Sequence, residues 1–306
     1  MLYDLIILGA GPAGLAASIY ASYHKLNHLV VGEIIGGTPL EAALIKNWPG
    51  TEAISGVELM KNFVRHAEGL GGKIAQGRVV SLKKRKDYFE VGTDREVYQA
   101  KTLLVAMGTR RRKMNIPGED KFLGKGVSYC ATCDAIFFKN KFVAVIGGSD
   151  SAAAAANLLA EHASKVYIIY RNSELRCQPA YLEQVKKNPK ITVIYNTNVL
   201  EVHGGKKVES VFLDRPFEES QLLKTDGVFV EIGAMPSTDL LNEIGVKLNP
   251  QEYVAVDEWG KTNVSGVYAA GDITTNTMGF NQIVAAAADG ATAVNAIYRY
   301  LKEIKK

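Results

Sequence analysis

Residues 3–14 read YDLIILGAGPAG, a nearly continuous apolar run that ends in a glycine-rich turn. An apolar run of this length predicts a parallel strand that is buried on both faces. Gly9, Gly11 and Gly14 have the spacing of a dinucleotide-binding fingerprint, where they permit a tight turn, the approach of a pyrophosphate and close packing of the next helix. The start of the chain therefore predicts a nucleotide-binding α/β fold.

The segment that follows the turn predicts a helix packed on the sheet. Leu15, Ile19 and Tyr23 recur at four-residue spacing, so we expect these side chains to face the strands. A phosphate would lie at the N-terminus of this helix, where unpaired N–H groups and the helix dipole favour anions. The next strand, His28–Val31, is expected to end beside an acid that binds a ribose, and the candidate Glu33 comes one residue late. The ribose partner therefore stays open.

A second copy of the pattern, FVAVIGGSDSA, occupies residues 142–152. Its apolar half predicts another buried strand, and an alanine-rich helix follows the glycines. Ser149 replaces the middle glycine, which narrows the room for a pyrophosphate, although a serine hydroxyl can also donate to phosphate. The next strand, Val166–Ile169, is followed by Arg171 rather than by an acid, and an arginine at this point favours the 2′-phosphate of NADP.

Two later segments are expected to complete the first fold. The strand Leu103–Ala106 leads to Gly108, where small residues allow a ligand close to the main chain. The apolar run 266–271 delivers Asp272, whose carboxylate can accept a hydrogen bond from a ribityl hydroxyl of a flavin. The closing helix, from Gln282 onward, is rich in small residues and can approach a cofactor ring, and its N-terminus can stabilise negative charge on a reduced flavin.

Between the two fingerprints lie Cys130 and Cys133, separated by two residues. Such a pair can close a small disulfide ring, and this geometry can lower the pKa of one thiol so that it attacks at neutral pH. The alternative is half of a zinc site, which needs four Cys or His ligands. The only other cysteine is Cys177, and no histidine lies within a short loop of the pair. The pattern therefore favours a redox-active disulfide and no metal.

Composition and charge exclude several classes of protein. The length of 306 residues fits two domains of about 150 residues each. No apolar run reaches the roughly 18 residues of a membrane span. The first residues show a strand pattern without the basic segment of a signal peptide, so we expect a cytoplasmic protein that does not enter a membrane. The net charge of +4 is thinly spread, and its densest clusters, residues 83–86 and 110–113, have no interleaved aromatics, so we expect no nucleic-acid binding.

In their order and spacing these motifs resemble the low-molecular-weight bacterial and archaeal thioredoxin reductases, which are FAD-dependent pyridine nucleotide-disulfide oxidoreductases. The resemblance covers nearly the whole chain. It implies an α/β fold of two Rossmann-like, three-layer nucleotide-binding domains, the second inserted into the first. The FAD domain would comprise residues 1–112 and 243–306, and the NAD(P)H domain with the cysteine pair would comprise residues 113–242. The resemblance also implies a homodimer, and a thioredoxin-like or glutaredoxin-like protein as electron acceptor.

The resemblance assigns roles to individual residues. Cys133 would face the flavin, Cys130 would exchange with the acceptor protein, and Asp134 would transfer protons. FAD would contact Gly9, Gly11, Pro12, Ala13, Gly14, Glu33, Gly36, Gly37, Asn47, Gly108, Gly271, Asp272, Gln282 and Ile283. The nicotinamide coenzyme would contact Gly147, Gly148, Ser149, Asp150, Ser151, Arg171 and Arg176.

Three positions depart from the family pattern. Asn172 replaces one of three arginines that bind the 2′-phosphate, Ser149 replaces a glycine, and Asn281 stands where an arginine is common. These changes concern the electron donor more than the acceptor. We expect NADPH as the donor, with NADH possible. The alternatives are a flavin disulfide reductase that takes electrons from another donor, such as ferredoxin or a deazaflavin, and a redox sensor without turnover.

Overall fold

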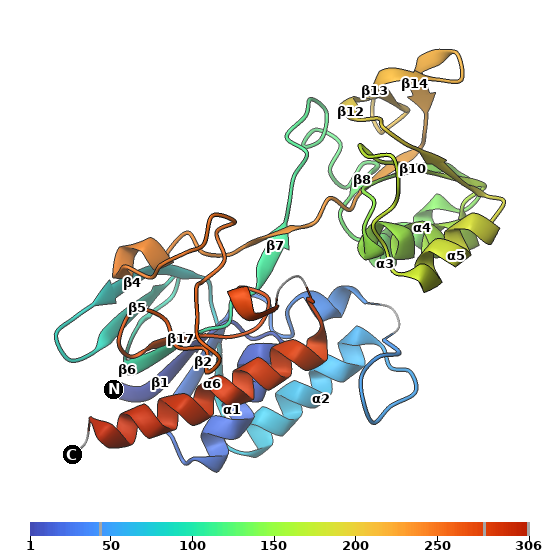
Figure 1. Ribbon diagram of the computed structural model, residues 1–306. Helices are drawn as coiled ribbons and strands as arrows, with labels where there is room; N and C mark the ends of the chain where they lie inside the picture. The colour runs from blue at the N-terminus through green and yellow to red at the C-terminus, as the bar shows by residue number, and fades with distance from the viewer. Residues whose placement is uncertain (43–44, 278–279, 305–306) are drawn as a thin grey trace. The chain divides into compact units, whose positions relative to one another are not determined.

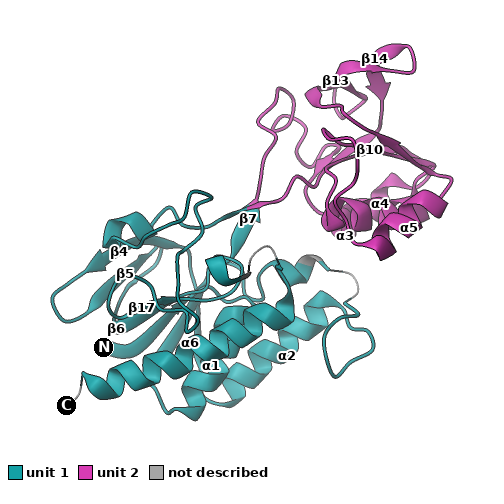
Figure 2. Cartoon of the chain, viewed as in Figure 1, with its two compact units in different colours: residues 1–110, 235–306 teal, residues 111–234 magenta. Residues whose placement is uncertain are grey.

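The chain folds into two compact units, which Figure 2 shows in different colours. The computed structural model describes residues 1–42, 45–277 and 280–304. We call the first unit the outer unit and the second the inserted unit. The outer unit comprises Met1–Arg110 and Met235–Lys306, and the inserted unit comprises Arg111–Ala234.

The chain enters the inserted unit after Arg110 and leaves it after Ala234. The sequence predicts these crossings near Lys113 and Asn242, so the second crossing comes earlier than expected. The reason is that Leu241 is fully buried in the core of the outer unit. The crossings lie in two short paired strands, β7 (Thr109–Arg111) and β16 (Ala234–Pro236).

The outer unit is built on a seven-stranded mixed sheet, in which β3, β2, β1 and β6 run parallel in this order. Figure 1 labels β1, β2 and β6 of this sheet, with α1 and α6 nearby. The first half of β6 pairs antiparallel with β5, which pairs with β4, and the second half pairs with β17. Leu8 of β1 stands opposite Val31 and Val105, so the carboxyl ends of the three central strands meet at one edge. The strands are β1 (Leu2–Leu8), β2 (His28–Gly32), β3 (Lys73–Gln76), β4 (Val79–Lys84), β5 (Phe89–Thr93), β6 (Val97–Val105) and β17 (Val267–Ala269).

Alternate side chains of β1 enter two different cores. Ile6 and Leu8 pack with the C-terminal segment on one face of the sheet, and Leu5 and Ile7 pack with α1 and α6 on the other face. A strand buried on both faces is what the apolar run predicts, and this prediction is confirmed. The helices of the outer unit are α1 (Pro12–Tyr23), α2 (Gly56–Gly69), α6 (Ile283–Glu303) and the short 3-10 helices η1 (Thr38–Glu41), η3 (Leu241–Ile244) and η4 (Thr275–Thr277).

The face that α1 turns to the sheet differs from the predicted one. The side chains that pack there are those of Ala13, Ala17 and Ala21. Tyr23 is 68% exposed, and Leu15 is buried in a separate cluster with Met60 of α2. The prediction was wrong because α6 packs so closely on α1 that a Cβ at Gly290 would collide with the carbonyl oxygen of Ala13. Only small side chains fit between these helices.

The inserted unit repeats the same plan on a five-stranded parallel sheet, in the order β11-β10-β9-β15-β8. The predicted α/β fold with two Rossmann-like units is confirmed. A separate antiparallel sheet, β12-β13-β14, belongs to the same unit. Its elements are β8 (Val127–Ser128), α3 (Ala131–Asp134), η2 (Ala135–Phe138), β9 (Phe142–Ile146), α4 (Asp150–His162), β10 (Lys165–Ile169), α5 (Pro179–Lys187), β11 (Ile191–Ile194), β12 (Val199–His203), β13 (Ser210–Phe217), β14 (Ser220–Lys224) and β15 (Gly227–Val230). Among the described residues of both units, no helix has the length and apolar character needed to cross a membrane.

Candidate active site

A cavity of about 1010 Å³ lies in the outer unit at the carboxyl ends of β1, β2 and β6. This is the edge at which open parallel sheets bind their ligands. Most of the residues that the sequence assigns to FAD lie in its lining. They are Gly9, Gly11, Pro12, Ala13, Glu33, Gly37, Gly108, Gly271, Asp272, Gln282 and Ile283.

The first fingerprint has the geometry of a phosphate cradle. Gly9 has a φ of +114°, and a Cβ there would collide with the carbonyl oxygen of Ala106. A Cβ at Gly14 would collide with the carbonyl oxygen of Gly9, which explains the close packing of helix on turn. At Gly11, by contrast, the nearest atom to an added Cβ is the Cα of Gly37, 4.0 Å away. A side chain at Gly11 would therefore fill cavity space that a pyrophosphate needs.

The N-termini of α1 and α6 point into this cavity. Gly11 caps α1 and Gln282 caps α6, and neither helix has a side-chain hydrogen bond at its cap. The first N–H groups of each helix are therefore available to an anionic ligand, as helix N-termini commonly are. Asn47 takes part indirectly, because its Nδ2 donates to Oε1 of Gln282 at 2.8 Å. Gly36 contributes through its main-chain N–H, which donates to the carbonyl oxygen of Ala10 at 2.8 Å.

A second carboxylate, which belongs to no sequence motif, acts on Asp272. Burial, and next the charge of Asp289, raise the pKa of Asp272 to about 6. Burial also raises the pKa of Asp289, while the N–H of Gly271, which donates to its Oδ2 at 3.2 Å, lowers it. The hydrogen bond through Gly271 links the α6 carboxylate to the residue beside Asp272. The arrangement can hold a proton near the place where a ribityl chain would lie.

Sequence reasoning missed another part of the lining. Arg78, Val79 and Val80, at the start of β4, line the cavity. Arg110 and Asp239 also lie in the lining, joined by two hydrogen bonds of 2.8 and 3.3 Å. These residues belong to no motif, and they reach the cavity only because the sheet brings separate segments together.

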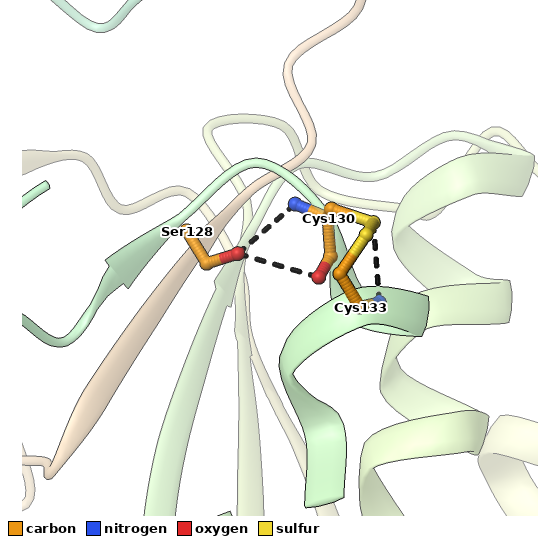
Figure 3. The surroundings of a disulfide bond; sticks show 3 residues. All are labelled: Ser128, Cys130 and Cys133. Carbon is orange, nitrogen blue, oxygen red and sulfur yellow. Dashed lines mark hydrogen bonds between the residues drawn. A yellow bond between two sulfur atoms is a disulfide. The ribbon is translucent and has the colours of Figure 1, made fainter. Parts of the chain in front are cut away.

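Cys130 and Cys133 form a disulfide with a Cα–Cα distance of 5.3 Å, as predicted (Figure 3). Cys130 caps the N-terminus of α3, and its Sγ accepts the N–H of Cys133 at 3.1 Å. The Oγ of Ser128 accepts the N–H of Cys130 at 3.0 Å and donates to its carbonyl oxygen at 3.3 Å. Cys130 is half-buried, Cys133 is exposed, and Asp134 ends α3 half-buried. The main chain of Cys130 is therefore fixed from both sides.

The second fingerprint, also in the inserted unit, combines open and covered positions. Gly147 has a φ of +142°, and a Cβ there would collide with the carbonyl oxygen of Glu231. An added Cβ at Gly148 would lie 2.5 Å from the ring of Tyr170, so this ring covers the glycine. The Nδ2 of Asn172 donates to the hydroxyl of Tyr170 at 2.9 Å and holds the ring. Access to the glycine turn therefore depends on Tyr170.

The polar residues predicted for this second site fall into two groups. Asp150 already has hydrogen-bond partners. Its carboxylate accepts the main-chain N–H of Gln178 at 2.6 Å and the side-chain Nε2 of Gln178 at 2.8 Å. Ser149 and Ser151 share a hydrogen bond of 3.1 Å between their hydroxyls. Arg171 and Arg176 are exposed, and the N–H of Arg176 donates to the carbonyl oxygen of Gly148 at 2.7 Å. The two guanidinium groups can therefore meet an anion beside the fingerprint.

Comparison with known proteins agrees with this geometry. The model of the pyridine nucleotide-disulphide oxidoreductase family matches residues 3–290. Thioredoxin reductase from Treponema pallidum is 40% identical over 306 residues, covering 99% of this chain and 98% of that protein. The structure of Lactococcus lactis thioredoxin reductase is 33% identical with a TM-score of 0.93, covering 98% of this chain and 99% of the other. A ferredoxin-flavin thioredoxin reductase from Clostridium acetobutylicum is 33% identical with a TM-score of 0.54, covering 100% and 99%.

Proposed function

Because the chain belongs to the pyridine nucleotide-disulphide oxidoreductase family, we propose that it is a thioredoxin-disulfide reductase. In this reaction NADPH would supply two electrons and bound FAD would carry them, and the Cys130–Cys133 pair passes them to the disulfide of thioredoxin or a similar small dithiol protein. The observation that carries this proposal is the disulfide at the N-terminus of α3, in a chain whose other unit has a dinucleotide cradle.

FAD fits the residues of the outer cavity. Bound FAD would supply two-electron transfer between a nicotinamide and a disulfide. The N-termini of α1 and α6 would hold anionic groups, and the open face at Gly11 leaves room for a pyrophosphate. Asp272 would accept a hydrogen bond from a ribityl hydroxyl, and Asp289 holds the N–H of the preceding residue, Gly271. Glu33 lines the same cavity and is the candidate partner of the ribose.

We assign Cys130 as the thiol that attacks the acceptor protein. The N–H of Cys133 donates to the Sγ of Cys130, and such a hydrogen bond stabilises a thiolate. The other thiol, Cys133, would then be the one that exchanges electrons with bound FAD. Asp134 directly follows Cys133 and is the candidate for proton transfer when the disulfide opens, because opening produces two thiols and consumes two protons.

The acceptor protein meets an apolar surface next to the disulfide. Ile136 and Phe137 of η2 are 66% and 77% exposed, although both are large apolar side chains. They follow Cys133 by three and four residues, in the 3-10 helix that directly follows α3, and a protein that exchanges disulfides with this pair would approach close to them. Exposed apolar surface of this kind is typical of a protein-binding site. We therefore assign the acceptor surface to a thioredoxin-like or glutaredoxin-like protein.

NADPH is the electron donor in this proposal. Arg171 and Arg176 are exposed beside the second fingerprint, and guanidinium groups suit the 2′-phosphate. The residues directly after β10 provide no acid in the place where a free ribose hydroxyl would be bound. The test is anaerobic mixing of the purified flavoprotein with NADPH, followed by addition of oxidised thioredoxin. Bleaching of the flavin and release of thioredoxin thiols are expected, and failure of thioredoxin to be reduced by the bleached protein would reject the assignment.

A second candidate keeps the flavin and the disulfide but uses a donor that is not a nicotinamide, such as ferredoxin or a deazaflavin. Its favouring observation is that the ring of Tyr170, held by Asn172, covers Gly148 in the second fingerprint. The same anaerobic experiment separates the two candidates. If dithionite reduces flavin and disulfide while NADPH and NADH both fail, the donor is of another class.

The assembly and location follow from the same proposal. We propose a homodimer in the cytoplasm, where a reducing environment suits a catalytic cysteine pair. Tyr20 and Tyr23 of α1 are 48% and 68% exposed and offer apolar surface that a second copy could cover. Light scattering should give twice the mass of one chain, and a monomer at micromolar concentration would reject the dimer.

A further inference from the structure

Glu119 is a buried carboxylate that the proposed mechanism does not use. It is 2% exposed and lies in the inserted unit. Burying a carboxylate is costly unless hydrogen bonds replace the lost water. Three such bonds are present: the N–H of Met114 donates at 2.9 Å, the N–H of Asn115 donates at 2.7 Å, and the hydroxyl of Tyr129 donates in a short contact.

The third donor connects Glu119 to the redox disulfide. Tyr129 directly precedes Cys130 in the chain. Burial, followed by the hydrogen bond and the charge of Glu119, raises the pKa of Tyr129, so its hydroxyl stays protonated and remains a donor. On the other side of Tyr129, the hydroxyl of Ser128 bonds to both the N–H and the carbonyl oxygen of Cys130. The side chain of Tyr129 and the main chain of Cys130 are therefore both anchored.

Glu119 also anchors a left-handed turn of the main chain. Asn115 has a φ of +57°, in the left-handed region that few residues other than glycine adopt. The N–H of this residue is one of the three donors to Glu119. The same carboxylate thus ties the segment that enters the inserted unit to the segment that carries Cys130. A group that joins two loops at one buried point restricts the motion of both.

We propose that Glu119 is a positioning residue for the disulfide: through Tyr129 it fixes the main chain of Cys130 and thereby favours the closed disulfide over the open dithiol. The physical reason is proximity. When the disulfide opens, an anchored Cys130 keeps its thiol near that of Cys133, and the high effective concentration favours closure. Without the anchor, the open state gains conformational freedom and becomes more populated. The inference rests on the redox activity of this disulfide, which is part of the proposed function.

The test is the equilibrium of the full-length flavoprotein with dithiothreitol. In this exchange the Cys130–Cys133 bond is reduced to two thiols while dithiothreitol loses two hydrogens and closes to its cyclic disulfide. Alkylation followed by mass measurement counts the open and closed forms. The variants are Tyr129→Phe, which removes only the hydroxyl, and Glu119→Gln, which removes the charge. The matched control is Asp120→Asn, because Asp120 is a neighbouring carboxylate, 75% exposed, that pairs with Lys113 at 2.8 Å.

We expect Tyr129→Phe, which removes the hydrogen bond to Glu119, and Glu119→Gln, which takes the charge from its acceptor, each to shift the ratio of dithiol to disulfide upward by roughly three- to tenfold, the order of the net contribution of one hydrogen bond. The double variant should shift no further than the larger of the two single shifts, because both changes act on one link. Asp120→Asn should stay within about twofold of the unchanged protein. If Glu119→Gln does not fold, as judged from its flavin content, Tyr129→Phe carries the test.

Two results would overturn the inference. The first is a ratio of dithiol to disulfide in Tyr129→Phe that is no higher than in the control Asp120→Asn. The second is a shift in Asp120→Asn as large as the shift in Tyr129→Phe. Neither depends on a nicotinamide or on thioredoxin, because dithiothreitol supplies the electrons. A failure of the proposed function would appear as a flavoprotein that cannot reduce thioredoxin, while the ratio could still be measured.

Discussion

Replacing Asn172 with arginine tests the donor site most directly. In the structure Asn172 directly follows the exposed Arg171, and its Nδ2 donates to the hydroxyl of Tyr170 at 2.9 Å. An arginine there would restore a third guanidinium beside Arg171 and Arg176. A charge-assisted phosphate contact contributes about 1.5–3 kcal/mol, or roughly ten- to hundredfold in affinity. Because both neighbouring arginines are exposed, solvent screening favours the lower end, so we expect about a tenfold fall in the KM for NADPH.

The substitution also removes the hydrogen bond that holds the ring of Tyr170 over Gly148. Tyr170→Phe separates the two effects, because it breaks the same hydrogen bond without adding a charge. Release of the ring should change NADPH and NADH kinetics alike, since both coenzymes have the same pyrophosphate. The added charge should act on NADPH alone, because only NADPH has the 2′-phosphate. Arg171→Ala should raise the KM for NADPH for the same reason.

The assay is the initial rate of anaerobic flavin reduction over a concentration series of each coenzyme. The expected pattern is a large gain for NADPH and a small one for NADH in Asn172→Arg. An equal gain with both coenzymes would refute the assignment of these arginines to a 2′-phosphate. A protein that neither coenzyme reduces, before or after the substitution, would support the second candidate donor.

Three further predictions concern the disulfide and the cavity of the outer unit. Cys130→Ser should show a long-wavelength charge-transfer band between a Cys133 thiolate and oxidised flavin, whereas Cys133→Ser should lack this band and trap a mixed disulfide with thioredoxin; the reverse would exchange the two roles. Asp134→Asn should slow turnover with thioredoxin by about 10²-fold, measured as kcat, because a positioned proton-transfer group is lost; a change of less than about twofold would remove Asp134 from the mechanism. The pKa of Asp272 rises on folding from 3.8 to about 6, so the folded protein binds more protons between these values and the free energy of unfolding of the flavin-free protein should fall as pH rises through this window. Asp272→Asn should flatten that dependence, and an unchanged pH profile of the unfolding midpoint would contradict the burial of this carboxyl group.

The features that could be read from the sequence are local ones. An apolar run followed by a glycine turn specifies strand, turn and helix within a few residues, and both copies of this pattern fold as predicted. The cysteine pair closes a disulfide because its spacing within one turn of α3 brings the two sulfurs together. Each of these predictions needs no knowledge of what else packs nearby.

The features that could not be read depend on distant segments. The face of α1 toward the sheet consists of alanines because α6, from the far end of the chain, packs against it. Asp289 matters only because α6 begins beside the turn that carries Asp272. Arg78 lines the cavity because it follows β3, whose end is joined to the end of β2 by the hydrogen bond from the N–H of Gly77 to the carbonyl oxygen of Gly32. None of these residues belongs to a sequence motif, and each contributes only because the fold brings distant segments together.

The residues around the disulfide come from one short stretch of chain, whereas those that line the cavity of the outer unit come from distant segments. The hydrogen bonds that fix Cys130 come from Ser128, Cys133 and, through Tyr129, from Glu119, all within one short stretch of the inserted unit. That stretch is anchored to the parallel sheet by the pairing of β8 with β15, where Ser128 stands opposite Phe229, a fully buried residue of the same unit. The geometry of the disulfide is therefore set inside the inserted unit alone. Variants of the outer cavity should change the reduction of the flavin while leaving the equilibrium of this disulfide with dithiothreitol unchanged.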